Sequence, residues 1–154
     1  MAIYIDDLLS KNQTGYEMHR LIEKYYGDLN HLFINDNGKL IPLSSLPLNK
    51  FFNFVKNIPY RRDKRPVEVV ARPDKIVRNR RLGMDCKKKS IIVASYLKGR
   101  GYPYRLVASS RFPTKQVHHV FPQVQIFGKW LNVDATYPDY RLFQPKSVTY
   151  AEVL

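Results

Sequence analysis

The sequence contains very little cysteine, because Cys86 is the only one among its 154 residues. A lone cysteine excludes an internal disulfide framework and a zinc site built from several thiolates. No stretch approaches the roughly 18 apolar residues that a membrane-spanning helix requires. The chain also lacks internal repeats, low-complexity runs and Gly/Ser-rich linkers. We therefore expect one domain, residues 1–154, built around a single hydrophobic core.

The N-terminus lacks the positive charge of a secretory signal. Its first ten residues, MAIYIDDLLS, contain two aspartates and no Lys or Arg, so we expect no signal peptide. With the lone cysteine, this favours a protein made in a reducing compartment. Nothing in the pattern of residues points to a cofactor or a bound metal, and we expect neither.

Positive charge is abundant and unevenly distributed. Residues 61–115 hold 17 of the 26 Lys and Arg but only 4 of the 13 Asp and Glu, whereas the remainder of the chain is balanced. A local excess of this kind attracts polyanions or acidic protein surfaces in a salt-dependent way. A solvated basic face that only aids solubility is an equally reasonable interpretation.

The order of the expected elements indicates an α+β fold. Apolar residues recur at helical spacing over 14–26 and 45–57, and residues 32–41 have the pattern of a hairpin. The basic stretch 60–82 is expected to be an extended connection with one short strand at 67–71. A helix over 86–98 follows, then strands at 104–109, 117–127 and 129–135, the last two joined by a tight turn at Phe127-Gly128-Lys129. Helices followed by an antiparallel sheet are typical of α+β domains.

Three residues on these elements have the types and positions of a nucleophilic triad. Cys86 lies in the first turn of its helix, behind Asp85 as the expected N-cap, where unpaired N–H groups favour a thiolate. His119 and Asp134 lie on the two strands of one expected hairpin, which can bring them together. A cysteine, a base and a carboxylate that orients the base form the triad seen on unrelated folds.

Each member has a simpler explanation when considered alone. A buried cysteine is more often an inert small hydrophobe than a nucleophile, and Asp134 could only organise a turn. His118 is a second candidate base. Adjacent strand residues point to opposite faces, so only one of the two histidines can meet Cys86.

Four segments resemble the landmarks of the transglutaminase-like cysteine peptidases, a family with a papain-like fold that includes bacterial and phage-encoded members. Residues 83–90 (GMDCKKKS) resemble the start of the cysteine helix, and 101–107 (GYPYRLV) resemble the entry into the first strand. Residues 119–124 (HVFPQV) and 130–136 (WLNVDAT) resemble the segments that carry the histidine and the aspartate. The similarity covers about 56–137, and its register selects His119 over His118.

This resemblance implies a mechanism and a packing arrangement. Cys86 would attack a carboxamide or peptide carbonyl, His119 would shuttle the proton, and Asp134 would hold the imidazole. The acyl-enzyme would pass to water (peptidase or amidase) or to an amine (transglutaminase). The cysteine helix would pack on the antiparallel sheet, after N-terminal helices. The second oxyanion donor is not assigned by the sequence.

The residues after the cysteine depart from the family, in which they are often acidic. Here they are Lys87, Lys88 and Lys89, which either stabilise a thiolate or contact an acidic partner. We expect these three lysines, together with Arg80 and Arg81, to contact an anion or a partner.

Two classes of function follow. The first is cysteine-dependent acyl transfer on protein substrates. The second is a non-catalytic assembly or virion protein that keeps this fold and binds nucleic acid or an acidic subunit through residues 61–115. A nucleic-acid-binding protein proper is a third, weaker interpretation, because no known nucleic-acid motif is present. We expect no membrane partner, and a location in the cytoplasm, or in the virion for a phage-encoded chain.

Overall fold

The computed structural model describes residues 2–6, 11–63, 67–113 and 117–154. It is an α+β structure with antiparallel sheets, as the sequence predicts. Its α-helices are α1 (Lys11–Tyr25), α2 (Leu48–Lys56), α3 (Pro73–Arg78) and α4 (Cys86–Gly99). Its main sheet has the order β7-β6-β5-β8, formed by β7 (Lys129–Asn132), β6 (His119–Ile126), β5 (Tyr104–Ser110) and β8 (Tyr150–Val153).

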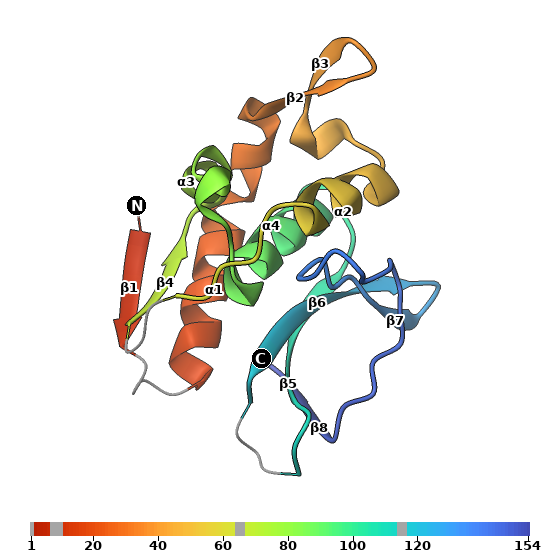
Figure 1. Ribbon diagram of the computed structural model, residues 1–154. Helices are drawn as coiled ribbons and strands as arrows, with labels where there is room; N and C mark the ends of the chain where they lie inside the picture. Colours follow the sequence, from red (N-terminus) through yellow and green to blue (C-terminus); the bar gives the residue numbers. More distant parts are fainter. Residues whose placement is uncertain (1, 7–10, 64–66, 114–116) are drawn as a thin grey trace.

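Helix α4 lies at the centre of the fold (Figure 1). It packs against β5 and β6 on one side and against α1 on the other, and it also contacts α2 and α3. Most of its residues are therefore buried, from Ile91 to Leu97 without interruption. Ser90 donates a hydrogen bond from Oγ to the Val120 carbonyl at 3.2 Å, which fixes the first turns of α4 to β6.

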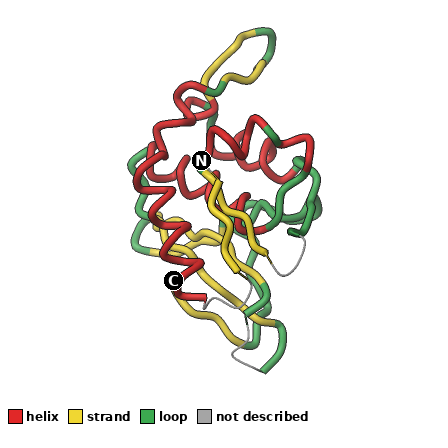
Figure 2. The backbone as a smooth tube through the Cα atoms, turned by 90° about the vertical axis from the view of Figure 1, so that its left-hand side faces the viewer, coloured by secondary structure: helices red, strands yellow, loops and turns green. Residues whose placement is uncertain are grey.

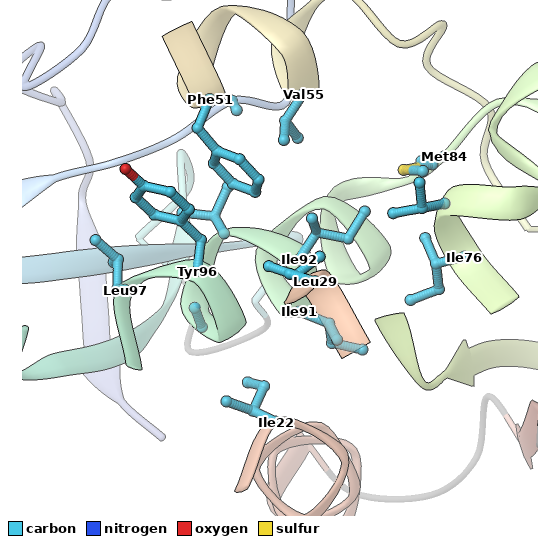
Figure 3. Close-up of a cluster of buried hydrophobic side chains, with 14 of the residues drawn as sticks. Ile22, Leu29, Phe51, Val55, Ile76, Met84, Ile91, Ile92, Tyr96 and Leu97 are labelled. Carbon is cyan, nitrogen blue, oxygen red and sulfur yellow. The ribbon is translucent and has the colours of Figure 1, made fainter. Parts of the chain in front are cut away.

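The hydrophobic core surrounds α4 (Figure 3). Phe51 of α2 stacks on Tyr96 of α4 with 4.1 Å between the ring centroids. The buried Tyr96 hydroxyl donates to the Leu46 carbonyl, so the one polar atom of that side chain is satisfied. The core anchors the helix whose first residue is Cys86.

Two small antiparallel pairs complete the structure. Strand β1 (Ala2–Asp6) pairs with β4 (Val67–Ala71) beside α1. Strands β2 (Phe33–Asp36) and β3 (Lys39–Pro42) form the predicted hairpin, which protrudes from the molecule in both views (Figures 1 and 2). Asn37 and Gly38 in its turn have φ values of 53° and 85°, as a two-residue hairpin turn requires.

Several sequence-based predictions were wrong in detail. The stretch 60–82 contains helix α3 and a 3-10 helix (Arg80–Leu82) rather than only extended chain, because Pro73 begins a helix at its first position. Helix α2 begins at Leu48 after Pro47, three residues later than the start of the expected helical stretch 45–57. The sequence also gave no indication of β8. That strand gains its hydrogen bonds from β5, a partner remote in sequence.

Candidate active site

Cys86 is the first residue of α4, and its environment is set by the residues before it. Asp85 is the N-cap, as predicted, and its Oδ1 accepts a hydrogen bond from Lys88 N at 3.0 Å. Gly83 has φ of 86°, and a Cβ there would lie 2.7 Å from Arg61 Cβ. Glycine is therefore required for residues 59–61 to lie against 83–84, where Tyr60 and Met84 form a bridge.

The β6–β7 hairpin brings His119 and Asp134 together. Its two-residue turn, Phe127-Gly128, has φ values of 50° and 76°, and its register pairs Gln123 with Asn132. Extending this register places position 134 opposite position 121, two residues from His119 and on the same face. Asp134 lies just beyond the end of β7 at Asn132, rather than on the strand as predicted.

The structure brings Cys86, His119 and Asp134 together. His119 Nε2 lies 2.6 Å from Asp134 Oδ2, and the Cys86 thiol is close enough to the same imidazole to help raise its pKa. Burial alone would lower the pKa of His119, but Asp134 and Cys86 outweigh it and raise the pKa to about 9. His118, in contrast, is exposed and packs edge-on against Phe112 at 5.6 Å.

The Asp134 carboxylate has four donors around it. Oδ1 accepts from Thr136 N at 3.1 Å and Thr136 Oγ1 at 2.5 Å. Oδ2 is shared by His119 and by Lys146 Nζ, which is 2.5 Å away. Burial opposes ionisation, but His119 and Lys146 dominate and lower the pKa of Asp134 to about 2. The carboxylate is therefore ionised, and each of its two oxygens has two partners.

Aromatic side chains surround the site. Tyr137 packs against Tyr60 and Tyr140, with ring centroids 4.9 Å and 5.2 Å apart. Burial, the neighbouring tyrosines and Cys86 raise the pKa of Tyr137 to about 12, so its hydroxyl stays neutral. Cys86 itself is only 8% exposed. The surrounding protein therefore covers most of Cys86.

The three lysines after Cys86, which were predicted to contact an anion or a partner, make contacts within the chain. Lys89 is 1% exposed, so the prediction that it contacts a partner was wrong. Its Nζ donates to the carbonyls of Ile58 at 2.7 Å, Thr136 at 2.8 Å and Lys56 at 3.4 Å. Lys87 pairs with Asp85 at 2.5 Å and Lys88 with Asp63 at 2.6 Å, both largely buried. Helical spacing around α4 turns one of the three lysines inward.

Arg80 and Arg81 are exposed and line an open pocket of about 500 Å³ with Phe54, Asn57, Ile58 and Pro59. Arg80 Nη1 donates to the Val77 carbonyl at 3.0 Å, and its guanidinium lies 5.9 Å from the Phe54 ring. Tyr60 comes directly after the pocket-lining Pro59 in sequence, and its ring packs on Tyr137 at the candidate site.

The sequence reasoning missed Lys146 and the tyrosines. No spacing or motif signals them, because Tyr137, Tyr140 and Lys146 come from the connection between β7 and β8, and Tyr60 comes from the segment after α2 (Figure 1). Within the described ranges, no three His, Cys, Asp or Glu side chains are grouped to hold a metal ion. In the same part of the chain, no helix is both long enough and apolar enough to cross a membrane.

Comparison with known proteins gave little. No protein-family model matches the sequence, and no curated protein matches it. Among solved structures, the chain is similar to a proposed cysteine protease from Cytophaga hutchinsonii, with a TM-score of 0.45 and 12% identity. The similarity covers 99% of this chain but 62% of that one, so the chain spans about three fifths of its length. Similarity at this level does not establish a common fold.

Proposed function

We propose that the protein carries out cysteine-dependent acyl transfer on protein substrates, with Cys86 as nucleophile, His119 as base and Asp134 as the residue that orients it. The observation that carries this proposal is the His119 imidazole, which lies 2.6 Å from Asp134 Oδ2 and has the Cys86 thiol close enough to raise its pKa. A chance grouping of a helix N-terminus, a strand and a post-strand turn in this order is improbable without selection for the chemistry.

In the proposed reaction the Cys86 thiolate attacks the acyl carbon of a carboxamide or ester. The Sγ–carbon bond forms, the bond to the leaving group breaks, and His119 gives its proton to the leaving group. Water or an amine then attacks the thioester and restores the thiol. The Cys86 backbone N–H at the helix N-terminus is one donor available to the oxyanion.

The proposal includes a papain-like, transglutaminase-like arrangement. Two observations support it: the cysteine begins a central helix, and this helix packs on the antiparallel sheet that carries His119. The four sequence segments described above occur in the matching order along these elements. Ser90, in the cysteine segment, has a clear role in bonding α4 to the strand of His119.

We predict that an electrophile such as iodoacetamide labels Cys86 faster than it labels free cysteine at about pH 6, where a free thiol is almost entirely protonated. The lone cysteine makes the measurement unambiguous, because intact mass reports one site. His119→Gln should slow labelling to the free-thiol rate or below. Equal rates in the wild type and in His119→Gln would contradict the proposed role of His119.

A second candidate function is binding of an acidic protein partner, without catalysis, as in an assembly or virion component. The arginine pocket favours it. Arg62 and Arg81 are exposed and form no hydrogen bond or ion pair with any described residue. Asp63 and Asp74, two acidic residues of the same basic stretch, are already paired with Lys88 and Arg78. Unmatched positive charge beside an apolar wall suits an acidic peptide segment.

We predict that the double variant Arg80→Glu/Arg81→Glu weakens binding of a mixed acidic and aliphatic peptide, and that wild-type binding falls steeply with added salt. Arg100→Glu, an exposed change elsewhere, is the matched control. Binding of single-stranded RNA in preference to the peptide, lost in the same double variant, would favour nucleic acid as the partner. Binding that is insensitive to salt and to both substitutions would contradict a charged interface at this pocket.

A further inference from the structure

Lys146 is a charged residue of the site that neither the sequence motifs nor the proposed reaction uses. Its Nζ lies 2.5 Å from Asp134 Oδ2, the same oxygen that accepts from His119 Nε2. Its ammonium also lies 4.2 Å from the centroid of the Tyr140 ring and 5.0 Å from that of Phe121. The side chain is only 15% exposed. A lysine held by a carboxylate and two rings has little freedom to move away.

The sharing of one carboxylate oxygen has an electrostatic consequence. In a cysteine triad, the negative carboxylate stabilises the imidazolium and so strengthens its hold on the proton. A second cation on the same oxygen offsets part of that negative charge. At the few ångströms involved, two charges interact appreciably even at a high effective dielectric constant, so the second cation measurably weakens the hold of Asp134 on the imidazolium.

We propose that Lys146 is a positioning residue that locks the Asp134 carboxylate toward His119 and moderates its pull on the His119 proton. Thr136 holds one oxygen of Asp134 and Lys146 holds the other. Only one direction of approach then remains for the imidazole. By limiting the stabilisation of the imidazolium, Lys146 keeps His119 able to release its proton to a leaving group.

The other charged and titratable groups around this site are accounted for. From α4, Cys86 acts on His119, and Lys89 is a further cation acting on Asp134. From the segment after β7, Tyr137 and Tyr140 are kept neutral mainly by burial, which raises the pKa of each. Among these groups, Lys146 is the cation in direct contact with the Asp134 carboxylate.

Arg111 and Asp139 influence the pKa of Tyr140, whose ring lies beside the Lys146 ammonium. Neither contacts Asp134 among the described interactions. Replacing Lys146 therefore removes one positive charge from the carboxylate without removing a charge partner of any other group named here. A neutral replacement of similar length, Lys146→Met, keeps the apolar stem that packs on Phe121 and Tyr140.

The test is the titration of His119 followed by NMR on histidine-labelled protein. All compared proteins carry Cys86→Ala, so that the thiol does not couple to the imidazole. Lys146→Met should raise the midpoint of His119 by about one pH unit, because the full charge of Asp134 then acts on the imidazolium. Lys146→Arg should restore the original midpoint. Lys129→Met, at the exposed far turn of the hairpin, should leave it in place.

Lys146→Gln serves as a second neutral variant if Lys146→Met does not fold. An unchanged or lowered midpoint in a folded neutral variant would overturn the role of Lys146, as would an equal shift in Lys129→Met. This inference rests on the proposed function, but the titration of His119 can be measured whether or not the protein catalyses acyl transfer. Slow electrophile labelling of wild-type Cys86 would contradict the function, whereas an unmoved His119 titration beside fast labelling would contradict only the role of Lys146.

Discussion

Replacing Cys86 with alanine is expected to abolish acyl transfer from an activated ester such as p-nitrophenyl acetate, a loss of at least about 1,000-fold. The reason is that Cys86 supplies the only thiol in the chain and the bond-forming atom of the proposed reaction. His119→Ala should lose about as much, because a nucleophile and its base act as a unit and their losses do not add. Release of p-nitrophenolate, corrected for the uncatalysed rate, measures both.

Asp134→Asn should be less severe, retaining roughly 10 to 100 times more activity than the other two variants. It keeps the shape of the side chain but removes the charge that favours the imidazolium. His118→Ala is the matched control, since His118 is adjacent in sequence but exposed and directed at Phe112. A loss in His118→Ala equal to that in His119→Ala would mean that the wrong histidine has been assigned.

Replacing Lys89 with methionine is expected to lower the free energy of unfolding by about 3 kcal/mol. The Lys89 ammonium is buried, and it donates to three carbonyls from two segments: those of Lys56 and Ile58 at and after the end of α2, and that of Thr136 after Asp134. Burial lowers the pKa of Lys89 to about 8, with Asp134 opposing the shift. Methionine fills the same volume but leaves those buried carbonyls without a donor.

Urea denaturation at about pH 7 measures the loss, because Lys89 is then still mostly protonated in the folded state. Lys75→Met on the exposed side of α3 is the control and should change stability by less than about 0.5 kcal/mol. Equal stability of Lys89→Met and the wild type would show that the three carbonyls find other donors and that Lys89 does not hold the segments together.

Because Lys89 is buried, it is unsuitable for a charge-reversal test of partner binding by the basic stretch 61–115. Reversing Lys87, Lys88 and Lys89 together would disrupt the interior as well as any surface, and so could not report on a partner. The structure pairs the other two with Asp85 and Asp63. Exposed Arg80 and Arg81 are the appropriate positions for charge reversal.

The predictable parts of the fold are those determined by local chemistry. The Asp85 cap, the Asn37-Gly38 turn and the Phe127-Gly128 turn each follow from residues that favour one backbone conformation. The hairpin then dictates that positions 119 and 134 are close, since its register follows from its turn. The contact between His119 and Asp134 agrees with that local reasoning.

The parts that were missed depend on contacts between segments far apart in sequence. Strand β8 exists because β5 offers a free edge, and Lys146 reaches Asp134 only because the chain after β7 returns along the sheet. The inward turn of Lys89 depends on carbonyls supplied by two remote segments. None of these partners lies within the window over which periodicity and capping operate.

The most direct measurement is the mass of the protein during reaction with p-nitrophenyl acetate, quenched in acid and localised by peptide mapping. Our proposal predicts that one acetyl group accumulates on Cys86 in the wild type within the first turnovers. It should form far more slowly in His119→Gln and be absent at this position in Cys86→Ala. Acetylation spread over surface lysines, with Cys86 modified no faster than a free thiol and no slower without His119, would contradict a nucleophilic triad.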